Sequence, residues 1–166
     1  MRAHTVTLQG DGRFWQPDVT VATLVNREGR LLVVEECVDG TLVLNQPAGH
    51  LEPDESLADA ALRETQEETG WTVRLTGFVG AYQWRAPPRT GATTGRHYLR
   101  FVFCAEPVAH DAMQALDQGI VRAVWMPPGD LRAQRARHRS PLVWCCVADY
   151  LAGQRHPLSA LQHVPD

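Results

Sequence analysis

The alternation of hydrophobic and polar positions predicts a chain built mostly of strands and punctuated by helices. Apolar runs at 18–26 and 31–36 flank a turn and predict a hairpin, and 41–45 follows as a third strand. Further strands are predicted at 71–79, which continues toward Trp84, at 97–105 and at 120–126. Helices are predicted after Ser56, near 130–137 and over 140–152, the last with Ser140 as N-cap and Pro141 in the first turn.

Strands interleaved with two or three helices predict an α/β (α+β) layered domain. The expected architecture is an α/β/α sandwich, in which a mixed sheet is flanked by helices. We expect one domain over residues 18–158, preceded by an extension at 1–17 and followed by a tail at 159–166. A chain of 166 residues is long enough to bury a core in one such domain.

The most informative stretch is 49–71, which contains a complete helix. Ser56 followed by Asp59 resembles a capping box, and Gly70 stands where a left-handed glycine ends a helix. Near the end of this helix, Glu64 and two further glutamates occupy positions i, i+3 and i+4. Three carboxylates on one turn repel one another unless a cation neutralises them.

The helix register separates two interpretations of this acidic turn. A solvated acidic face would lie opposite the apolar side of the helix. At about 100° per residue, however, Glu64 and Glu68 fall within about 20° of the apolar Leu57. The carboxylates are therefore predicted to point toward the protein body, where they form a candidate site for a hard divalent cation.

Composition and charge exclude several other classes of protein. The formal net charge of −3 offers no broad basic surface, so we expect no nucleic-acid partner. No apolar run reaches membrane-spanning length, and we expect no membrane partner. The four cysteines show no metal-binding or CxxC spacing. We therefore expect a reduced, cytoplasmic protein whose thiols are free.

The 49–71 stretch resembles the Nudix box, a glycine- and glutamate-containing signature that ends in R-E-U-x-E-E-x-G-U, where U is a bulky apolar residue. Thr65 replaces the first apolar residue of this pattern, and Trp71 fills the last. Every other fixed position matches: Gly49, Glu55, Arg63, Glu64, Glu67, Glu68 and Gly70.

Most of the chain, over about 17–158, is also similar to the NudJ-type phosphatases within this superfamily. The resemblance implies a Nudix fold and Mg²⁺-dependent hydrolysis of pyrophosphate bonds, with Mn²⁺ as a possible substitute. It implies small phosphorylated substrates, either nucleoside di- and triphosphates or a metabolite such as hydroxymethylpyrimidine pyrophosphate, with release of phosphate. The loop at 88–96 and the N-terminal extension depart from that pattern.

The resemblance also assigns roles to residues of the box. Glu64, Glu67 and Glu68 would hold the metal, together with the carbonyl of Gly49, which lacks a Cβ and can approach closely. Either Glu67 or Glu68 would act as general base. Glu55 would orient the site or a metal, and Arg63 would hold a ligand glutamate in one rotamer.

Candidates for substrate binding lie outside the acidic turn. His50 follows the first box glycine and is a candidate phosphate contact, although a lone histidine is more often structural. Trp84 and Tyr82 are candidates to stack on a base, and Gln46 is a candidate hydrogen-bonding partner. The ordinary interpretation of these three is a pair of core aromatic residues and a polar loop residue.

Three functions therefore remain open at this point. The first is a NudJ-like hydrolase that releases phosphate. The second is a pyrophosphohydrolase that cleaves sugar- or dinucleotide-diphosphates internally into two monophosphates. The third is a catalytically silent Nudix-like binding module, which the intact set of glutamates disfavours because a binder has no need of them.

Overall fold

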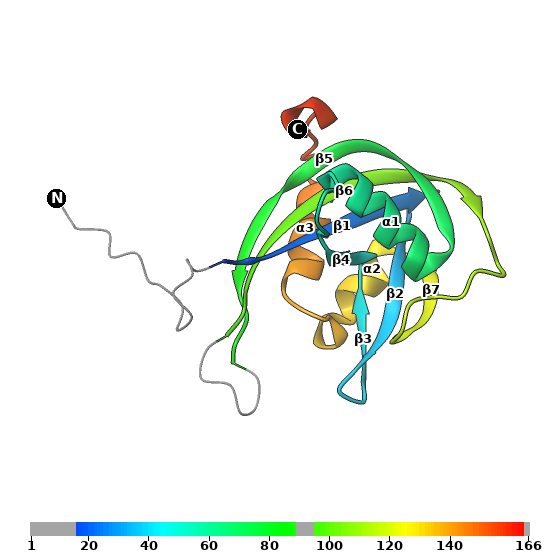
Figure 1. The fold of residues 1–166 in the computed structure, drawn as a ribbon. Helices are drawn as coiled ribbons and strands as arrows, with labels where there is room; N and C mark the ends of the chain where they lie inside the picture. The colour runs from blue at the N-terminus through cyan, green and yellow to red at the C-terminus, as the bar shows by residue number, and fades with distance from the viewer. Residues whose placement is uncertain (1–15, 89–94, 165–166) are drawn as a thin grey trace.

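A computed structural model describes residues 16–88 and 95–164 of the chain (Figure 1). The remaining residues, which include most of the predicted extension and Arg89 of the predicted loop, lie outside this description. No helix of the described residues is both long enough and apolar enough to cross a membrane.

The described residues form a seven-stranded mixed sheet in the order β3-β2-β1-β6-β5, with β4 paired to β1 and β7 paired to β2. The pairing of β1 with β6 is parallel, and the other pairings are antiparallel. The strands are β1 Asp18–Arg27, β2 Arg30–Val38, β3 Thr41–Asn45, β4 Ala48–His50, β5 Trp71–Arg85, β6 His97–His110 and β7 Ile120–Met126.

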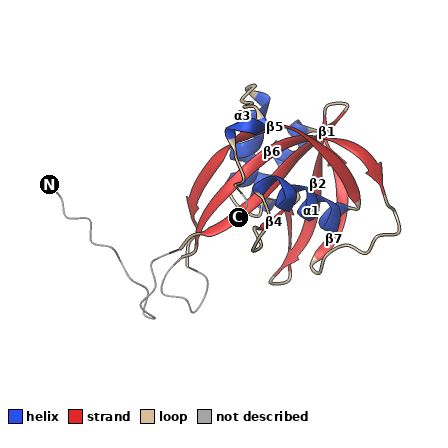
Figure 2. Ribbon diagram, turned by 45° about the horizontal axis from the view of Figure 1, so that its top comes forward, coloured by secondary structure: helices blue, strands red, loops and turns tan. Residues whose placement is uncertain are grey.

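Helices cover both faces of this sheet, as Figures 1 and 2 show. Helix α1 (Leu57–Thr69) lies on one face, while α2 (Pro128–Ala133) and α3 (Leu142–Leu151) lie on the other. Short 3₁₀ helices follow at Arg135–Arg137 and Leu158–Ala160. The predicted α/β/α arrangement is thereby confirmed.

The alternation of side chains along β1 explains the layers. Val21 packs with Ala60 and Ala61 of α1. The next residue, Ala22, belongs to the cluster on the other face, which contains Val143 of α3. Because successive residues of a strand point to opposite faces, one apolar strand supplies the core beneath both helical layers.

Three local predictions are corrected. No strand is predicted between 45 and the helix of the box, but β4 lies there and pairs with β1. The helix expected near 130–137 is split between α2 and a 3₁₀ turn. Ser140 does not cap α3, because the helix begins at Leu142 after Pro141 and makes no side-chain cap hydrogen bond. The Ser140 side chain instead lines a cavity.

Candidate active site

Helix α1 is fixed at both ends as its sequence predicts. Ser56 is in the extended conformation, and its hydroxyl accepts a hydrogen bond of 3.0 Å from the backbone N–H of Asp59. At the other end, Gly70 is left-handed at φ 69° and donates its N–H to the carbonyl of Gln66. Both predicted caps are confirmed, and they fix the position of the acidic last turns.

Two glutamates of the acidic turn point into the protein, as the register predicts. The residues Glu64 and Glu68 are 9% and 8% exposed. Strand β4 covers both: the N–H of Ala48 donates to a Glu68 carboxylate oxygen at 2.8 Å, and the Glu64 carboxylate lies against Gly49. A Cβ atom at position 49 would overlap that carboxylate, so the glycine is required for the close approach.

Arg63 holds several carboxylates in place. Its guanidinium donates to Glu55 at 2.7 Å and 3.0 Å, to Glu64 at 2.9 Å and to Glu67 at 3.0 Å. It also donates to the carbonyl of His50 at 3.1 Å, which ties the helix to β4. The contact with Glu67 is an i, i+4 ion pair of the kind that helix geometry favours, and these fixed contacts restrict each carboxylate to one orientation.

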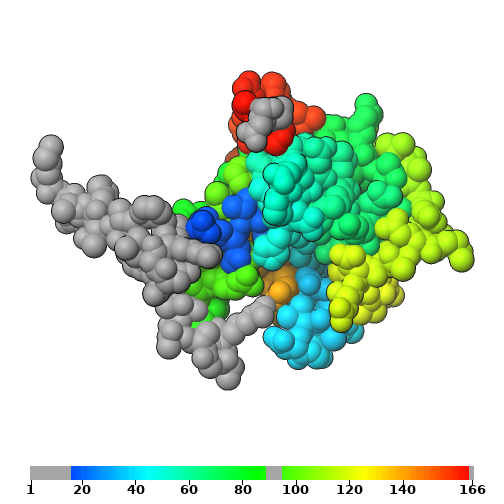
Figure 3. Space-filling view, in the orientation of Figure 1, coloured from blue at the N-terminus to red at the C-terminus, as the bar shows by residue number. Residues whose placement is uncertain are grey.

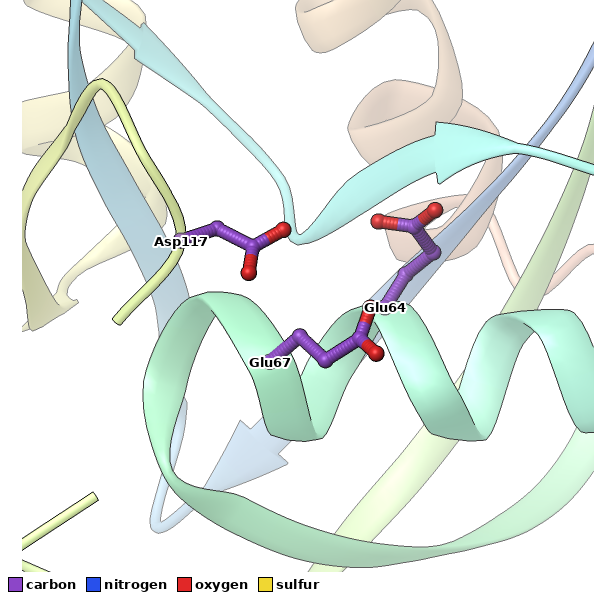
Figure 4. A group of neighbouring side chains, drawn as sticks. All are labelled: Glu64, Glu67 and Asp117. Carbon is purple, nitrogen blue, oxygen red and sulfur yellow. The ribbon is translucent and has the colours of Figure 1, made fainter. Parts of the chain in front are cut away.

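A further acidic side chain joins the turn from a distant part of the sequence. Asp117, in the connection between β6 and β7, offers a carboxylate oxygen within 4.8 Å of oxygens of Glu64 and Glu67. Figure 4 shows the Asp117 carboxylate facing the helix from the neighbouring loop. The backbone N–H of Asp117 donates to the carbonyl of Glu67 at 3.1 Å, which anchors the loop to the helix.

This donor set fits a hard divalent cation. The donors are all carboxylate oxygens, which Mg²⁺ and similar ions prefer. Glu64 of this set is buried, as is the neighbouring Glu68, and the burial of a charged group is costly unless a cation accompanies it. Among the described residues, Arg63 forms ion pairs with Glu64 and Glu67 but none with Glu68 or Asp117. A cation beside this set would relieve the repulsion that remains.

Burial shifts the pKa values of the two buried glutamates, Glu64 and Glu68. It raises the pKa of Glu68 to about 8, and the neighbouring charge of Glu64 acts in the same direction. Burial also raises the pKa of Glu64, although Arg63 opposes that shift. Without a metal, the folded protein therefore holds a proton on Glu68 at pH values where the unfolded chain has released it.

This proton uptake predicts how stability depends on pH. Between the unfolded pKa of about 4.3 and the folded value of about 8, the folded state binds more protons than the unfolded state. The metal-free protein should therefore become less stable as the pH rises from 5 to 8. Thermal melting in chelator across this range measures the slope, and added Mg²⁺ should raise the melting temperature most at the upper end.

The variant Glu68→Gln provides the control for this slope. Glutamine has the same shape but does not titrate, so the fall in melting temperature should be smaller in this variant. The lowered pKa values of Glu35 and Glu55, which hydrogen bonds from arginines cause, act below this window. The raised pKa values of Glu36 and Glu64 add to the slope and the lowered pKa of His138 opposes it, but these groups are present in both proteins, so the difference between the two slopes reports on Glu68. An unchanged slope in Glu68→Gln would contradict the assignment.

A cavity of about 490 Å³ opens beside the acidic turn, and its lining includes Gly49 and two of the four predicted substrate residues, His50 and Trp84. Figure 3 shows orange side chains near residue 140 recessed there, between the light-blue β2–β3 hairpin and the green end of β5. The structure places the other two away from the cavity lining. Gln46 is 1% exposed and donates to the carbonyl of Val143, while the Tyr82 hydroxyl donates to Asp149.

Comparison with known proteins agrees with this geometry. The model of the NUDIX domain matches residues 15–145. The chain is 41% identical to the Phosphatase NudJ of Escherichia coli (strain K12) over 147 residues, which are 89% of this chain and 92% of that protein. A NUDIX hydrolase from Nitrosomonas europaea superposes with a TM-score of 0.83 and 45% identity, over 90% of this chain and 98% of that one.

A UDP-X diphosphatase shares the fold at a TM-score of 0.65, with 15% identity over 89% of this chain and 69% of that chain. At that identity the likeness concerns the fold alone. The family match and the NudJ similarity cover most of the chain, and the matched region includes the acidic turn. The chain therefore belongs to the Nudix family and is a hydrolase that acts on phosphorus-containing anhydrides.

Proposed function

We propose that this protein is a Mg²⁺-dependent phosphatase that hydrolyses pyrophosphate bonds in small substrates and releases phosphate. The substrates we propose are nucleoside di- and triphosphates or a small pyrophosphorylated metabolite such as hydroxymethylpyrimidine pyrophosphate. The observation that carries the proposal is the buried acidic turn of α1, which adjoins a cavity containing aromatic and cationic side chains. The similarity to a curated phosphatase supports the release of phosphate.

The residues proposed to hold the metal are the three glutamates of the turn, Glu64, Glu67 and Glu68, with the Gly49 carbonyl and, from the structure, Asp117. When bound, Mg²⁺ would neutralise substrate charge and lower the pKa of a coordinated water. Mn²⁺ has similar ligand preferences and is expected to substitute.

The protein's own side chains would position these groups and accept a proton. Arg63 fixes the carboxylates of Glu55, Glu64 and Glu67, so that these side chains lose little conformational entropy when the substrate binds. Proton transfer from the attacking water is assigned to Glu67 or Glu68, as the resemblance to the family suggests. The side chain of Glu67 is 41% exposed and so is open to solvent, whereas that of Glu68 is buried.

The cavity is proposed to receive the rest of the substrate. Trp84 stacks on Tyr98 with ring centroids 5.7 Å apart and planes at 18°, and both residues line the cavity. Such a pair presents a flat apolar wall to an aromatic ring. His50 and Arg96 also line the cavity, so we propose that they contact phosphate oxygens.

The free state of all four cysteines agrees with the proposed cytoplasmic location.

A substrate panel with product analysis at fixed Mg²⁺ tests this proposal. The panel contains nucleoside di- and triphosphates, hydroxymethylpyrimidine pyrophosphate, a sugar nucleotide and a dinucleoside polyphosphate. We expect free phosphate to appear without an added phosphatase. Two monophosphates formed from the sugar nucleotide or the dinucleotide, with no free phosphate, would favour internal cleavage instead. No turnover across the panel would favour a binding module.

A further inference from the structure

Three polar side chains, two buried and one partly buried, line the cavity without using all their buried hydrogen-bonding atoms. Among the described residues, no hydrogen bond reaches Nη1 of Arg100, Oε1 of Glu36 or Oγ of Ser140. Arg100 and Ser140 are each 8% exposed, and the side chain of Glu36 is 18% exposed. All three line the same cavity. Buried polar atoms normally have partners, so three unused atoms around one cavity point to a ligand.

Arg100 is the most informative of the three. Its Nε lies 3.5 Å from the Thr20 hydroxyl, a long hydrogen bond, and no carboxylate of the described residues lies within the 4.0 Å of an ion pair. Arginine is rarely fully buried unless it is paired. Strand pairing places Arg100 directly opposite Thr20 in the sheet, so its position is set by the backbone.

Glu36 supplies the opposite chemistry beside it. Burial raises the pKa of Glu36, while the charge of Arg139, a hydrogen bond from Asn45 and the charge of Arg100 act in the other direction. The contact with Arg139 is loose at 3.6 Å from Nε to Oε1. A carboxylate accepts hydrogen bonds and a guanidinium donates them. The cavity therefore presents an acceptor near a donor, with the Ser140 hydroxyl able to serve as either.

This arrangement disfavours a second anionic group as the ligand. A phosphate or carboxylate placed against Arg100 would also face Glu36 and be repelled by it. A neutral edge that carries an N–H beside a hydrogen-bond acceptor satisfies both groups. Nitrogen heterocycles of the nucleobase type carry such an edge, and their flat faces suit the wall formed by Trp84 and Tyr98.

We propose that Glu36, Arg100 and Ser140 bind the polar edge of a nitrogen heterocycle in the substrate, with its N–H on Glu36 and its acceptor atom on Arg100. This proposal rests on the proposed function and adds the residues that select the non-phosphate part of the substrate. Gly49 lines the same cavity and lies against the Glu64 carboxylate. The phosphate groups of a substrate whose heterocycle occupies the cavity could therefore reach the acidic turn.

Binding of monophosphates tests this inference separately from hydrolysis, because a monophosphate contains no anhydride to cleave. The ligands are cytidine monophosphate, which has the polar edge, and benzyl phosphate, which has an aromatic ring without one. Calorimetry with the wild-type protein and Mg²⁺ should show cytidine monophosphate binding at least about tenfold more tightly, the effect expected when buried polar groups are satisfied. Equal affinities, or no binding of cytidine monophosphate, would overturn the inference.

Substitutions of the proposed residues then test which of them bind the heterocycle. Glu36→Gln should weaken cytidine monophosphate binding about tenfold and leave benzyl phosphate unchanged. Ser140→Ala should show a smaller loss in the same direction. Glu106→Gln, the same exchange at an exposed position of β6, is the matched control and should alter neither ligand. A loss of affinity in Glu36→Gln that is equal for both ligands would mean that the residue acts on the phosphate or on the fold.

Arg100→Lys addresses the donor while retaining its charge. Lysine lacks the guanidinium fork, so we expect weaker binding of cytidine monophosphate and an unchanged affinity for benzyl phosphate. Thermal melting of each variant establishes that it is folded. If Arg100→Lys fails to fold, the comparison of Glu36→Gln with Ser140→Ala still decides the question, because each of these two exchanges alters one functional group and preserves most of the side chain.

Discussion

Glu68→Gln should lower turnover on the order of a hundredfold while leaving the fold intact. The exchange removes a negative charge from the acidic turn without a change of shape. Glu68 is 8% exposed, and its carboxylate accepts a hydrogen bond from Ala48, so the side chain is fixed where the metal is proposed to bind. Measurement of kcat and KM with Mg²⁺ tests this expectation.

The same variant should gain stability in the absence of metal. Burial raises the pKa of Glu68 to about 8. The free energy of unfolding of the metal-free protein therefore falls at high pH, where the unfolded chain carries this group fully charged and the folded state disfavours the charge. Glutamine avoids this cost, so the melting temperature of Glu68→Gln in chelator at pH 8 should equal or exceed that of the wild type. The matched control Glu106→Gln, at an exposed site, should retain both activity and stability. Wild-type activity in Glu68→Gln would reject the role of this carboxylate.

Gly49→Ala should lower Mg²⁺ affinity and turnover by about tenfold to a hundredfold, the range seen when the environment of a metal ligand is disturbed. The added methyl would occupy the space of the Glu64 carboxylate, which must then move or rotate. Titration of Mn²⁺ into the variant, monitored by the electron paramagnetic resonance spectrum of free Mn²⁺, measures the loss of affinity directly.

Gly129→Ala is the control for this exchange. A Cβ at Gly129 meets no atom within 4 Å, and the position lies in α2 on the other face of the sheet. Metal affinity and turnover should therefore be unchanged in Gly129→Ala. Normal Mn²⁺ affinity in Gly49→Ala would show that the close contact between β4 and Glu64 is not needed for metal binding.

Local sequence rules suffice for α1 and its acidic turn. Ser56 and Gly70 delimit the helix, and the register from Leu57 places Glu64 and Glu68 inward. These features depend on residues within a few turns of one another, where helix geometry fixes direction. The Arg63–Glu67 contact belongs to the same class, as an i, i+4 pair.

Asp117 could not be found in this way. It is one of two aspartates in the connection between β6 and β7, 50 residues beyond Glu67, and no periodicity marks it. Only the folding of the β6–β7 connection onto α1 brings it to the site, through the backbone hydrogen bond to Glu67. Such a contact depends on tertiary structure, and the sequence signals no more than an acidic residue between two predicted strands.

The candidate substrate residues show a related limit. Tyr82 and Trp84 are two residues apart on β5 and so share a face, yet Trp84 lines the cavity while the Tyr82 hydroxyl bonds to Asp149 of α3. The alternation of a strand predicts the face, but the position of α3 decides which residue along that face is covered. Gln46 is likewise held by the carbonyl of Val143 in α3.

We propose that hydrolysis depends on a divalent cation held by the acidic turn of α1. The most direct measurement is phosphate release from the best panel substrate by the wild-type protein, first with Mg²⁺, then after chelation, and then after Mg²⁺ is restored in excess. We expect turnover to fall to background on chelation and to return in full. Undiminished turnover in chelator would contradict the claim.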